Sequence, residues 1–309
     1  MKKDKLDISN GIKNLALKSG FTDCGITSAG KLIKDSFRLR EWLDAGMQAG
    51  MDYMGNHFNE RVNPSGLVPG ARSVIVVLLN YFPVKQQKVK DNFLMSKYAY
   101  GHDYHRIMKS MLRRFLKSIN EQIIPIKGRV FVDSAPVLER ALARLAGLGW
   151  IGKHANLISP KHGSFCFIGE LIIDVELSYN TAIPDRCGTC TKCLQACPTG
   201  AIVRDRIIDS RKCISYWTIE NRGAIDSSFK GKFENRIFGC DICQDVCPWN
   251  HKAKPNAVEE FQLTTDLINM SRNSWIELTE DRFNELFKHT AVMRTKYRGF
   301  MRNIEFICK

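Results

Sequence analysis

The sequence has 309 residues and is strongly basic, with 46 Lys and Arg against 32 Asp and Glu and a formal net charge of +14. Its hydrophobic fraction of 44% excludes long disorder, and its longest apolar run, from Val74 to Leu79, is too short to cross a bilayer. No secretory or twin-arginine signal is present, so we expect a cytoplasmic protein with no membrane partner. In that compartment, clustered cysteines favour metal binding over disulfides.

The first part of the chain alternates between helical and strand patterns. Helical spacing over residues 8–20 ends at Gly20, a natural helix stop. Further elements follow in turn: a strand at 73–82, an amphipathic helix with a basic face at 104–123, a strand at 128–133, a helix at 135–150, and one or two buried strands at 164–177. This order predicts an α+β fold, with a layered α/β domain over residues 1–178.

Two further segments complete the predicted organisation. Cysteines dominate residues 179–258, where apolar periodicity fades. Because this segment has too little apolar material to build a core alone, we expect a small ferredoxin-like domain organised around metal. Residues 259–309 have helical patterns, with basic residues concentrated towards the end, and predict a short C-terminal helical segment.

The first cysteine run is "CGTCTKCLQACPTGAI", residues 187–202. Zinc sites typically pair two C-x2-C units, whereas this spacing matches the bacterial C-x2-C-x2-C-x3-C-P run for 4Fe–4S clusters. In that arrangement, the first three thiolates hold one cubane and the fourth reaches a second one. The run therefore predicts iron–sulfur clusters rather than zinc.

The second run, "CDICQDVCPWN", lacks its first cysteine, because Ile237 stands at that position. Cys213, alone between the two runs, is the natural substitute and brings the count to eight thiolates, enough for two cubanes. We assign four cysteines to each cluster: Cys187, Cys190, Cys193 and Cys247 to one, and Cys197, Cys213, Cys240 and Cys243 to the other.

Iron–sulfur clusters transfer single electrons, so a second cofactor or substrate site must receive them. Asp133 is a candidate for that site, since it ends a short predicted strand directly before a predicted helix with Pro136 in its first turn. Such a junction often faces a ligand crevice, but a carboxylate there also stabilises a helix N-terminus, and both interpretations remain open. No dinucleotide fingerprint or Walker A sequence occurs.

Several motifs together carry a family resemblance. The stretches "RVNPSGLVPGARSVIVVLLNYF", "KYAYGHDYH", "VDSAPVLERALARLAGLGWIGKHANLI", "RKCISYWTIE" and the two cysteine runs resemble epoxyqueuosine reductases, densely over residues 50–250. The C-terminal "FKHTAVMRTKYRGFMRN" is similar to that family too. The resemblance implies a cobalamin-dependent oxidoreductase with two 4Fe–4S clusters. It would reduce epoxyqueuosine to queuosine in the tRNA anticodon loop, the last step of queuosine biosynthesis.

The resemblance also implies roles for individual residues. Asp133 matches the aspartate proposed as proton donor in the family, a role that calls for a buried carboxyl with a raised pKa. It further suggests these cobalamin neighbours: His57, Asp133, Leu157, Ile168, Ile172, Ser215 and Asp241.

The stretch "DYHRIM" begins like a D-x-H-x-x-G cobalamin signature. Because Met108 replaces the glycine, we do not expect His105 to be an axial cobalt ligand. Tyr104 and His105 are expected either to lie at the substrate side or simply to pack the start of the helix.

Basic side chains are the candidate phosphate contacts for tRNA, although a solvated basic face is the alternative for most of them individually. They lie in the helix "MKSMLRRFLK", at Arg204–Arg206, and at Arg294, Lys296, Arg298 and Arg302. Family members often continue into further C-terminal helical repeats, whereas this sequence ends at Lys309. We expect a monomer served by an external electron donor. The alternatives are a reductive dehalogenase-like enzyme acting on a small molecule and a non-catalytic electron-transfer protein.

Overall fold

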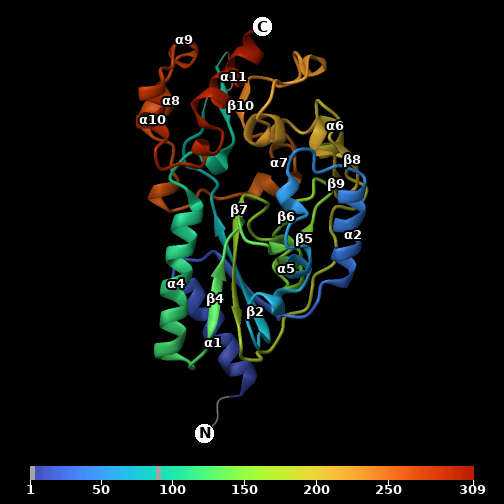
Figure 1. Cartoon of the computed structure of the whole chain (residues 1–309). Coiled ribbons are helices and arrows are strands. Elements are labelled where there is room, and N and C mark those ends of the chain that lie inside the picture. Colours follow the sequence, from blue (N-terminus) through green and yellow to red (C-terminus); the bar gives the residue numbers. More distant parts are fainter. Residues whose placement is uncertain (1–3, 88–91) are drawn as a thin grey trace.

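A four-stranded antiparallel sheet forms the centre of the N-terminal part (Figure 1). The computed structural model describes residues 4–87 and 92–309. The strands lie in the spatial order β1 (Asp23–Ser28), β2 (Ser73–Asn80), β7 (Cys166–Ile173) and β4 (Gly128–Phe131). Each neighbouring pair is antiparallel, with β7 between β2 and β4. The apolar β2 is buried along almost its whole length.

Helices cover both faces of this sheet. On one face lie α1 (Lys5–Lys18) and α4 (Tyr104–Gln122), whose apolar stripe packs against Leu171 of β7. On the other lies α5 (Glu139–Leu145), which packs in a second apolar cluster with Ile168 and Ile172. Because side chains alternate along a strand, even-numbered β7 residues face α5 and odd-numbered ones face α4.

The remaining elements lie outside the four-stranded sheet, and several of them build the cysteine-rich part. α2 (Ile33–Asp44) is tied to that part by its Trp42 indole, which donates to the carbonyl of Ile208 at 2.7 Å. The other short elements are α3 (Phe58–Val62), β3 (Leu94–Met95), β5 (Trp150–Ile151), β6 (Leu157–Ile158), α6 (Lys192–Ala196), β8 (Ile202–Arg204), β9 (Ile207–Ile208), β10 (Arg236–Phe238) and α7 (Ile242–Asp245).

The C-terminal helices form a core of their own at the end of the molecule far from the N-terminus (Figure 1). They are α8 (Thr265–Asn269), α9 (Arg272–Ile276), α10 (Glu280–Phe287) and α11 (Lys296–Cys308). Trp275, Phe283 and Phe300 are fully buried there, and they share the core with buried residues from two other segments: Phe93, Met95, Ala99, Tyr100, Ile237 and Phe238. β3 pairs with β10 inside this region, so three distant parts of the chain share one core.

The predicted α+β class and the main predicted elements are confirmed, with two corrections. The predicted helix at 135–150 is wrong in extent: α5 covers only Glu139–Leu145. Pro136 lies before it, and Gly147 ends it with φ +74°, where an added Cβ would lie 2.7 Å from a backbone oxygen. β1 was not predicted, because its six residues are only partly apolar. No helix among the described residues is long and apolar enough to span a membrane.

Candidate active site

Asp133 lies in the loop between β4 and α5, not at a helix N-terminus. Its backbone has φ +44°, a left-handed conformation that is rare for residues other than glycine. α5 begins six residues later, so the helix-capping interpretation of Asp133 is wrong. A strained conformation held by the surrounding structure is common at functional sites.

Two side chains from the start of α4 contact the carboxylate of Asp133. The Tyr104 hydroxyl donates to Oδ2 at 2.9 Å, and His105 Nε2 lies 2.9 Å from the same oxygen. His105 Nδ1 lies 2.7 Å from Oδ1 of Asp103, the N-cap residue of α4. The Tyr104 ring stacks between His105 and Phe167, with both centroids 4.1 Å away. Tyr104 and His105 therefore belong to the site and do more than pack the helix.

The proton of this group resides on His105. Burial would lower the pKa of His105, but its hydrogen bonds to Asp103 and Asp133 raise that pKa to about 9. Burial would raise the pKa of Asp133, but the hydrogen bonds from His105 and Tyr104 and the histidine charge hold it below its usual range. The expected raised pKa of Asp133 is thus wrong, because a carboxylate that accepts two hydrogen bonds favours its charged form.

A cavity of about 220 Å³ opens beside Asp133. Its lining is mostly aromatic and apolar, with two carboxyl groups: Tyr81, Tyr98, Tyr104, Asp133, Glu139, Cys166, Phe167 and Ile168. A larger cavity of about 340 Å³ lies near Ser28, Arg72 and Tyr179, away from these carboxyl groups. The smaller one carries the chemistry, since aromatic walls with a few convergent polar groups are typical of ligand sites.

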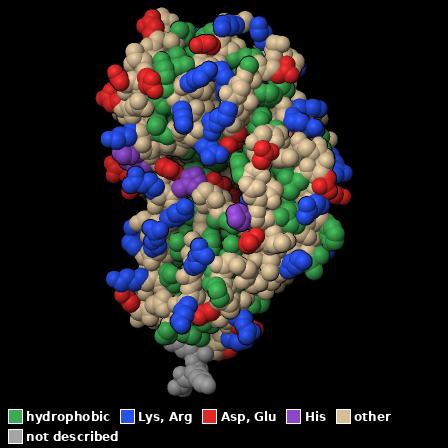
Figure 2. Space-filling view, in the orientation of Figure 1, with side chains coloured by type: hydrophobic (Ala, Val, Ile, Leu, Met, Phe, Trp, Pro, Cys, Tyr) green, Lys and Arg blue, Asp and Glu red, His purple; other side chains and the backbone are tan. Residues whose placement is uncertain are grey.

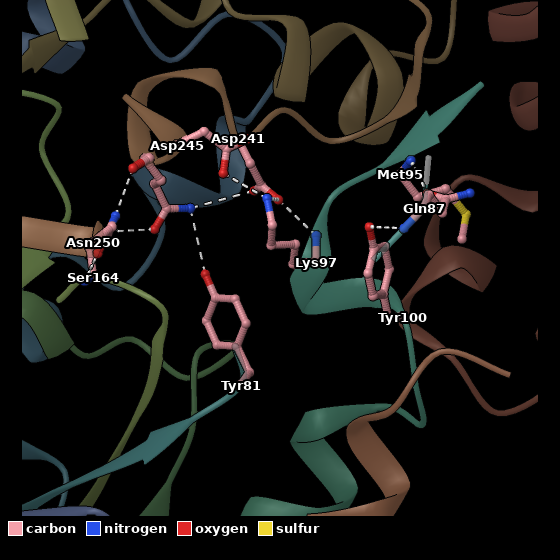
Figure 3. Close-up of polar contacts among 10 residues, drawn as sticks. Tyr81, Gln87, Met95, Lys97, Tyr100, Ser164, Asp241, Asp245 and Asn250 are labelled. Carbon is pink, nitrogen blue, oxygen red and sulfur yellow. Dashed lines mark hydrogen bonds and ion pairs between the residues drawn. The ribbon is translucent and has the colours of Figure 1, made fainter. Parts of the chain in front are cut away.

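A buried polar network connects this cavity to the second cysteine run (Figure 3). Gln244 Nε2 lies 3.5 Å from both the Tyr81 hydroxyl and Asp241 Oδ1. The Ser164 hydroxyl donates to Gln244 Oε1 at 2.8 Å, and the backbone N–H of Lys97 donates to Asp241 Oδ2 at 2.8 Å. The network fixes the α7 segment against the cavity wall.

The other expected cobalamin neighbours are spread over different surroundings. Ile168 lines the cavity, while Leu157 and Ile172 are buried in the apolar cluster around α5 and do not reach it. Asp241 is buried against Lys97. His57 is exposed at the start of α3 with φ +54°.

Ser215 adjoins a cysteine. Burial raises the pKa of the Cys213 thiol, and hydrogen bonds from the hydroxyl and the backbone N–H of Ser215 partly oppose that rise.

The eight cysteines of the two runs and Cys213 lie in two groups. In the first, burial and then the charges of Cys247 and Cys187 raise the pKa of Cys193 to about 11. Cys247 in turn has Cys187 and Cys190 as charged neighbours. These four are the cysteines that the spacing assigns to one cluster.

The second group contains Cys197, Cys213, Cys240 and Cys243. Burial raises the pKa of Cys240 to about 12, and Cys213 is among its charged neighbours. Burial and then the charges of Cys240 and Cys213 raise the pKa of Cys243, with a smaller contribution from Cys197. The composition of each group matches the assignment from the sequence, and the role of these thiols as ligands stays a prediction.

Comparison with known proteins gives the chain a family. Residues 61–134 match the model "Epoxyqueuosine reductase QueG, DUF1730", and residues 186–250 match the model "4Fe-4S double cluster binding domain". The chain is 49% identical to the epoxyqueuosine reductase of Cellulophaga algicola over 97% of both chains. The chain belongs to the epoxyqueuosine reductase family. It is also 37% identical to the Escherichia coli (strain K12) enzyme, covering 97% of this chain and 80% of that one.

Solved structures of epoxyqueuosine reductases have the same fold. The Streptococcus thermophilus structure matches with a TM-score of 0.88 and 29% identity, over 97% of this chain and 80% of that one. A second structure holds a tRNA-Tyr epoxyqueuosine-modified stem loop and matches with a TM-score of 0.89 and 26% identity, over 98% and 81%. The Bacillus subtilis structure, with a TM-score of 0.87 and 25% identity over 97% and 81%, has its catalytic aspartate loop swung out of the active site.

The residues present fit the iron–sulfur clusters of this family. Burial and neighbouring thiolates raise the pKa of Cys193 and Cys247 in one group and of Cys213, Cys240 and Cys243 in the other, a cost that coordination to iron would offset. N–H groups also point at two of the sulfurs: the Trp150 indole at Cys187 Sγ (3.4 Å) and the backbone of Ala201 at Cys197 Sγ (3.3 Å). Such bonds stabilise cluster thiolates and tune their reduction potential.

The cavity fits the reacting part of a cobalamin. The stacked rings of Phe167 and Tyr104, together with Ile168, give it a flat apolar lining. Its volume lies below the roughly 300 Å³ at which ligand pockets begin, so a whole cofactor would extend beyond it. The buried Nε2 of His154, in the loop before Leu157, has no hydrogen-bond partner among the described residues, although His154 does not line the cavity.

Several basic residues expected to bind phosphate make contacts within the protein instead. Arg302 donates to the carbonyls of Trp217, Asn221 and Gly223, all at 2.8 to 2.9 Å. Arg294 forms an ion pair with Glu220 at 2.8 Å. Arg302 is therefore a structural residue rather than a free phosphate contact.

Arg206 similarly bonds to Asp185 and to the carbonyl of Ile151. Other basic candidates, including Arg113, Arg114 and Arg298, are exposed. Figure 2 shows Lys and Arg side chains above and below a band of histidine and acidic side chains on this face of the molecule.

Reasoning from the sequence missed two carboxyl groups near the site, Glu139 and Glu170. Glu170 interrupts the apolar run "FIGELII" of β7, and that interruption was the available signal. Glu139 begins α5, where an acidic residue is ordinary, so no local pattern singled it out.

Proposed function

We propose that this chain reduces epoxyqueuosine to queuosine in the tRNA anticodon loop. The observation that carries the proposal is Asp133, held by Tyr104 and a protonated His105 beside an aromatic cavity. An acid at such a cavity suits the loss of an epoxide oxygen, which leaves as water only if protons are delivered.

The reaction consumes two electrons and two protons and converts the epoxide into a carbon–carbon double bond and water. The 4Fe–4S clusters pass electrons singly, and bound cobalamin supplies the strongly reducing centre that no side chain provides. The chain's own residues shape the cavity, hold the two clusters through their eight thiolates, and keep one proton on the His105–Asp133 pair.

We propose one role for each of the three segments predicted from the sequence. Residues 1–178 bind cobalamin and perform catalysis, 179–258 carry the two clusters, and 259–309 contribute to the contact with tRNA. The relative solved with a modified stem loop supports tRNA as the substrate. We further infer that an external protein donates the electrons. The enzyme is inferred to be a monomer, since one chain supplies every group named here. Its inferred location is the cytoplasm, where tRNA is found.

Replacing Asp133 by Asn tests the proposal. The Asn side chain keeps the shape but neither carries the charge that holds His105 protonated nor transfers a proton. We expect turnover of epoxyqueuosine-containing tRNA to fall at least about 100-fold, the usual effect of a direct acid–base group. Iron and cobalamin content should stay unchanged.

Asp281→Asn, at the exposed start of α10, is the matched control and should retain full turnover. Undiminished turnover in Asp133→Asn would show that Asp133 does not take part in proton transfer. A wild-type protein that holds both clusters but leaves modified tRNA unchanged would favour a small-molecule reductase if it retains cobalamin, and a bare electron carrier if it does not.

A further inference from the structure

Two carboxyl groups near Asp133, the half-buried Glu139 and the fully buried Glu170, have no role in the chemistry described so far. Each turnover needs two protons, and the His105–Asp133 pair holds only one. A second proton must come from another group or from water. Glu139 and Glu170 are the candidates.

Glu170 lies in the middle of the sheet without a partner. On β7 it pairs with Val76 of β2 and Phe131 of β4. Its side chain has no exposed surface, and neither carboxyl oxygen has a hydrogen-bond partner among the described residues. Burial of an unpaired charge is very costly, so Glu170 remains neutral by keeping its proton.

The geometry directs Glu170 towards the cavity. Side chains two residues apart on a strand share a face and stand about 7 Å apart. Glu170 therefore lies on the same face as Ile168, which lines the cavity. It is also paired in register with Phe131, only two residues before Asp133.

Glu139 is an electrostatic neighbour of both Glu170 and Asp133. It lines the cavity together with Asp133, whose charge is the main one acting on it. Glu139 is the largest charge acting on Glu170, ahead of Asp133. The three carboxyl groups thus form a series from the interior of the sheet to the cavity.

The charges around these groups favour stored protons. Burial and then the charge of Asp133 raise the pKa of Glu139 to about 7, against the opposing charges of Arg140 and His105. Burial and then the charges of Glu139 and Asp133 raise the pKa of Glu170 well above its usual value. No basic group opposes the shift at Glu170, so near neutral pH it is protonated while Glu139 exchanges protons readily.

We propose that Glu139 and Glu170 form a proton store behind Asp133 that supplies the second proton of each turnover. The inference rests on the proposed function. One proton leaves His105 through Asp133, and the second passes from Glu170 through Glu139 to Asp133. With two electrons delivered through the clusters, the epoxide oxygen leaves as water and both C–O bonds are replaced by one C=C bond. Solvent then reprotonates the store.

Glu170→Gln tests the store, since it keeps the side-chain volume but removes the transferable proton. Only Glu139 then remains, with its pKa of about 7. We expect kcat of the holoenzyme to match wild type within about twofold near pH 6 and to be about tenfold lower near pH 8.5, with KM for tRNA unchanged. Glu139→Gln should give a loss at both pH values, because it interrupts the series.

Infrared spectroscopy provides a readout independent of turnover. At pH 8.5, where Glu139 with its pKa of about 7 is ionised, the wild-type protein should show the C=O band of a protonated carboxyl, and Glu170→Gln should lack it. Glu176→Gln, an exposed carboxylate just beyond β7, is the matched control and should leave both the band and the kcat profile unchanged.

The outcomes separate the two proposals. If the wild-type holoenzyme does not convert epoxyqueuosine-containing tRNA, the proposed function is overturned. The proton store is then overturned too, because it was proposed as the proton source of that reaction. If wild type is active, three results overturn the store: a Glu170→Gln kcat profile that superimposes on wild type, a loss of kcat that is equal at all pH values, or a carboxyl band that persists in Glu170→Gln at pH 8.5.

Discussion

His105 and Asp133 act as one unit because a single proton serves both. The imidazole ring is flanked by the carboxylates of Asp103 and Asp133, at 2.7 and 2.9 Å, so both ring nitrogens donate when it is charged. The same contacts that hold Asp133 ionised keep the proton one bond away, on a ring that is only 27% exposed. A proton donor here is a pair of residues, and its acidity depends on both.

The stability of the fold should depend on pH through His105. Its pKa of about 9 in the folded protein exceeds the usual 6.5, so its contribution is complete below pH 6.5 and is lost as pH rises through 9. Between pH 6 and pH 9.5, we expect the free energy of unfolding to fall by about 1–2 kcal/mol more in wild type than in His105→Gln. This figure is lower than the full pKa shift would give, because solvent screens the half-exposed Asp133. Urea unfolding at both pH values measures this, and equal losses would contradict it.

At the scale of elements, α11 is attached to the cluster region by one arginine. Arg302 reaches from α11 to three carbonyls at the end of the Tyr216–Glu220 helical turn, and the neighbouring Asn303 donates to the carbonyls of Thr218 and Ile237. Carbonyls at a helix end have no partners within the helix, so Arg302 satisfies groups that would otherwise remain unpaired. The basic C-terminal segment is therefore partly structural.

Arg302→Ala should destabilise the protein rather than merely weaken tRNA binding. We expect a loss of about 3 kcal/mol in the free energy of unfolding, because charge-assisted bonds to half-buried carbonyls are lost. Arg298→Ala, exposed one turn earlier on α11, should change it by less than about 0.5 kcal/mol. Denaturant titration of both variants checks this. If Arg302→Ala left the free energy of unfolding unchanged, Arg302 would again be a candidate contact for tRNA phosphate.

At the scale of the whole molecule, the two cysteine runs cannot act separately. The first group takes three thiols from the first run and Cys247 from the second. The other takes Cys240 and Cys243 from the second run, Cys197 from the first, and Cys213 from between them. The buried network around Gln244 then connects the second run to the cavity, so cluster assembly and the shape of the active site are coupled.

Cys213→Ala should remove one cluster and leave the other. A reconstituted wild-type protein should contain about eight irons per chain, and the variant about four, since a cubane without one thiolate is lost. Cys308→Ala, an exposed cysteine outside both groups, is the control and should keep about eight. Eight irons in Cys213→Ala would mean that another ligand completes the cluster.

Local patterns in the sequence predicted much of this protein. The spacing of the cysteines gave the composition of both groups, and periodicity gave β2, α4 and β7, because each depends on residues close in the chain. Asp133 was identified from its place after a strand and from family motifs. The extent of α5 was not predicted, although Pro136 before it and Gly147 after it limit the helix locally.

The sequence by itself determined most of the elements and the family and predicted the grouping of the cysteines, since these follow from short-range spacing and from motifs. Only the tertiary structure decided the proton chemistry. His105 lies 28 residues from Asp133 in the chain, yet it reverses the expected pKa shift of that carboxyl. Burial and neighbouring charge set a pKa, and both arise only when distant segments pack together. The same holds for Glu170, whose missing partners are visible only in the folded sheet.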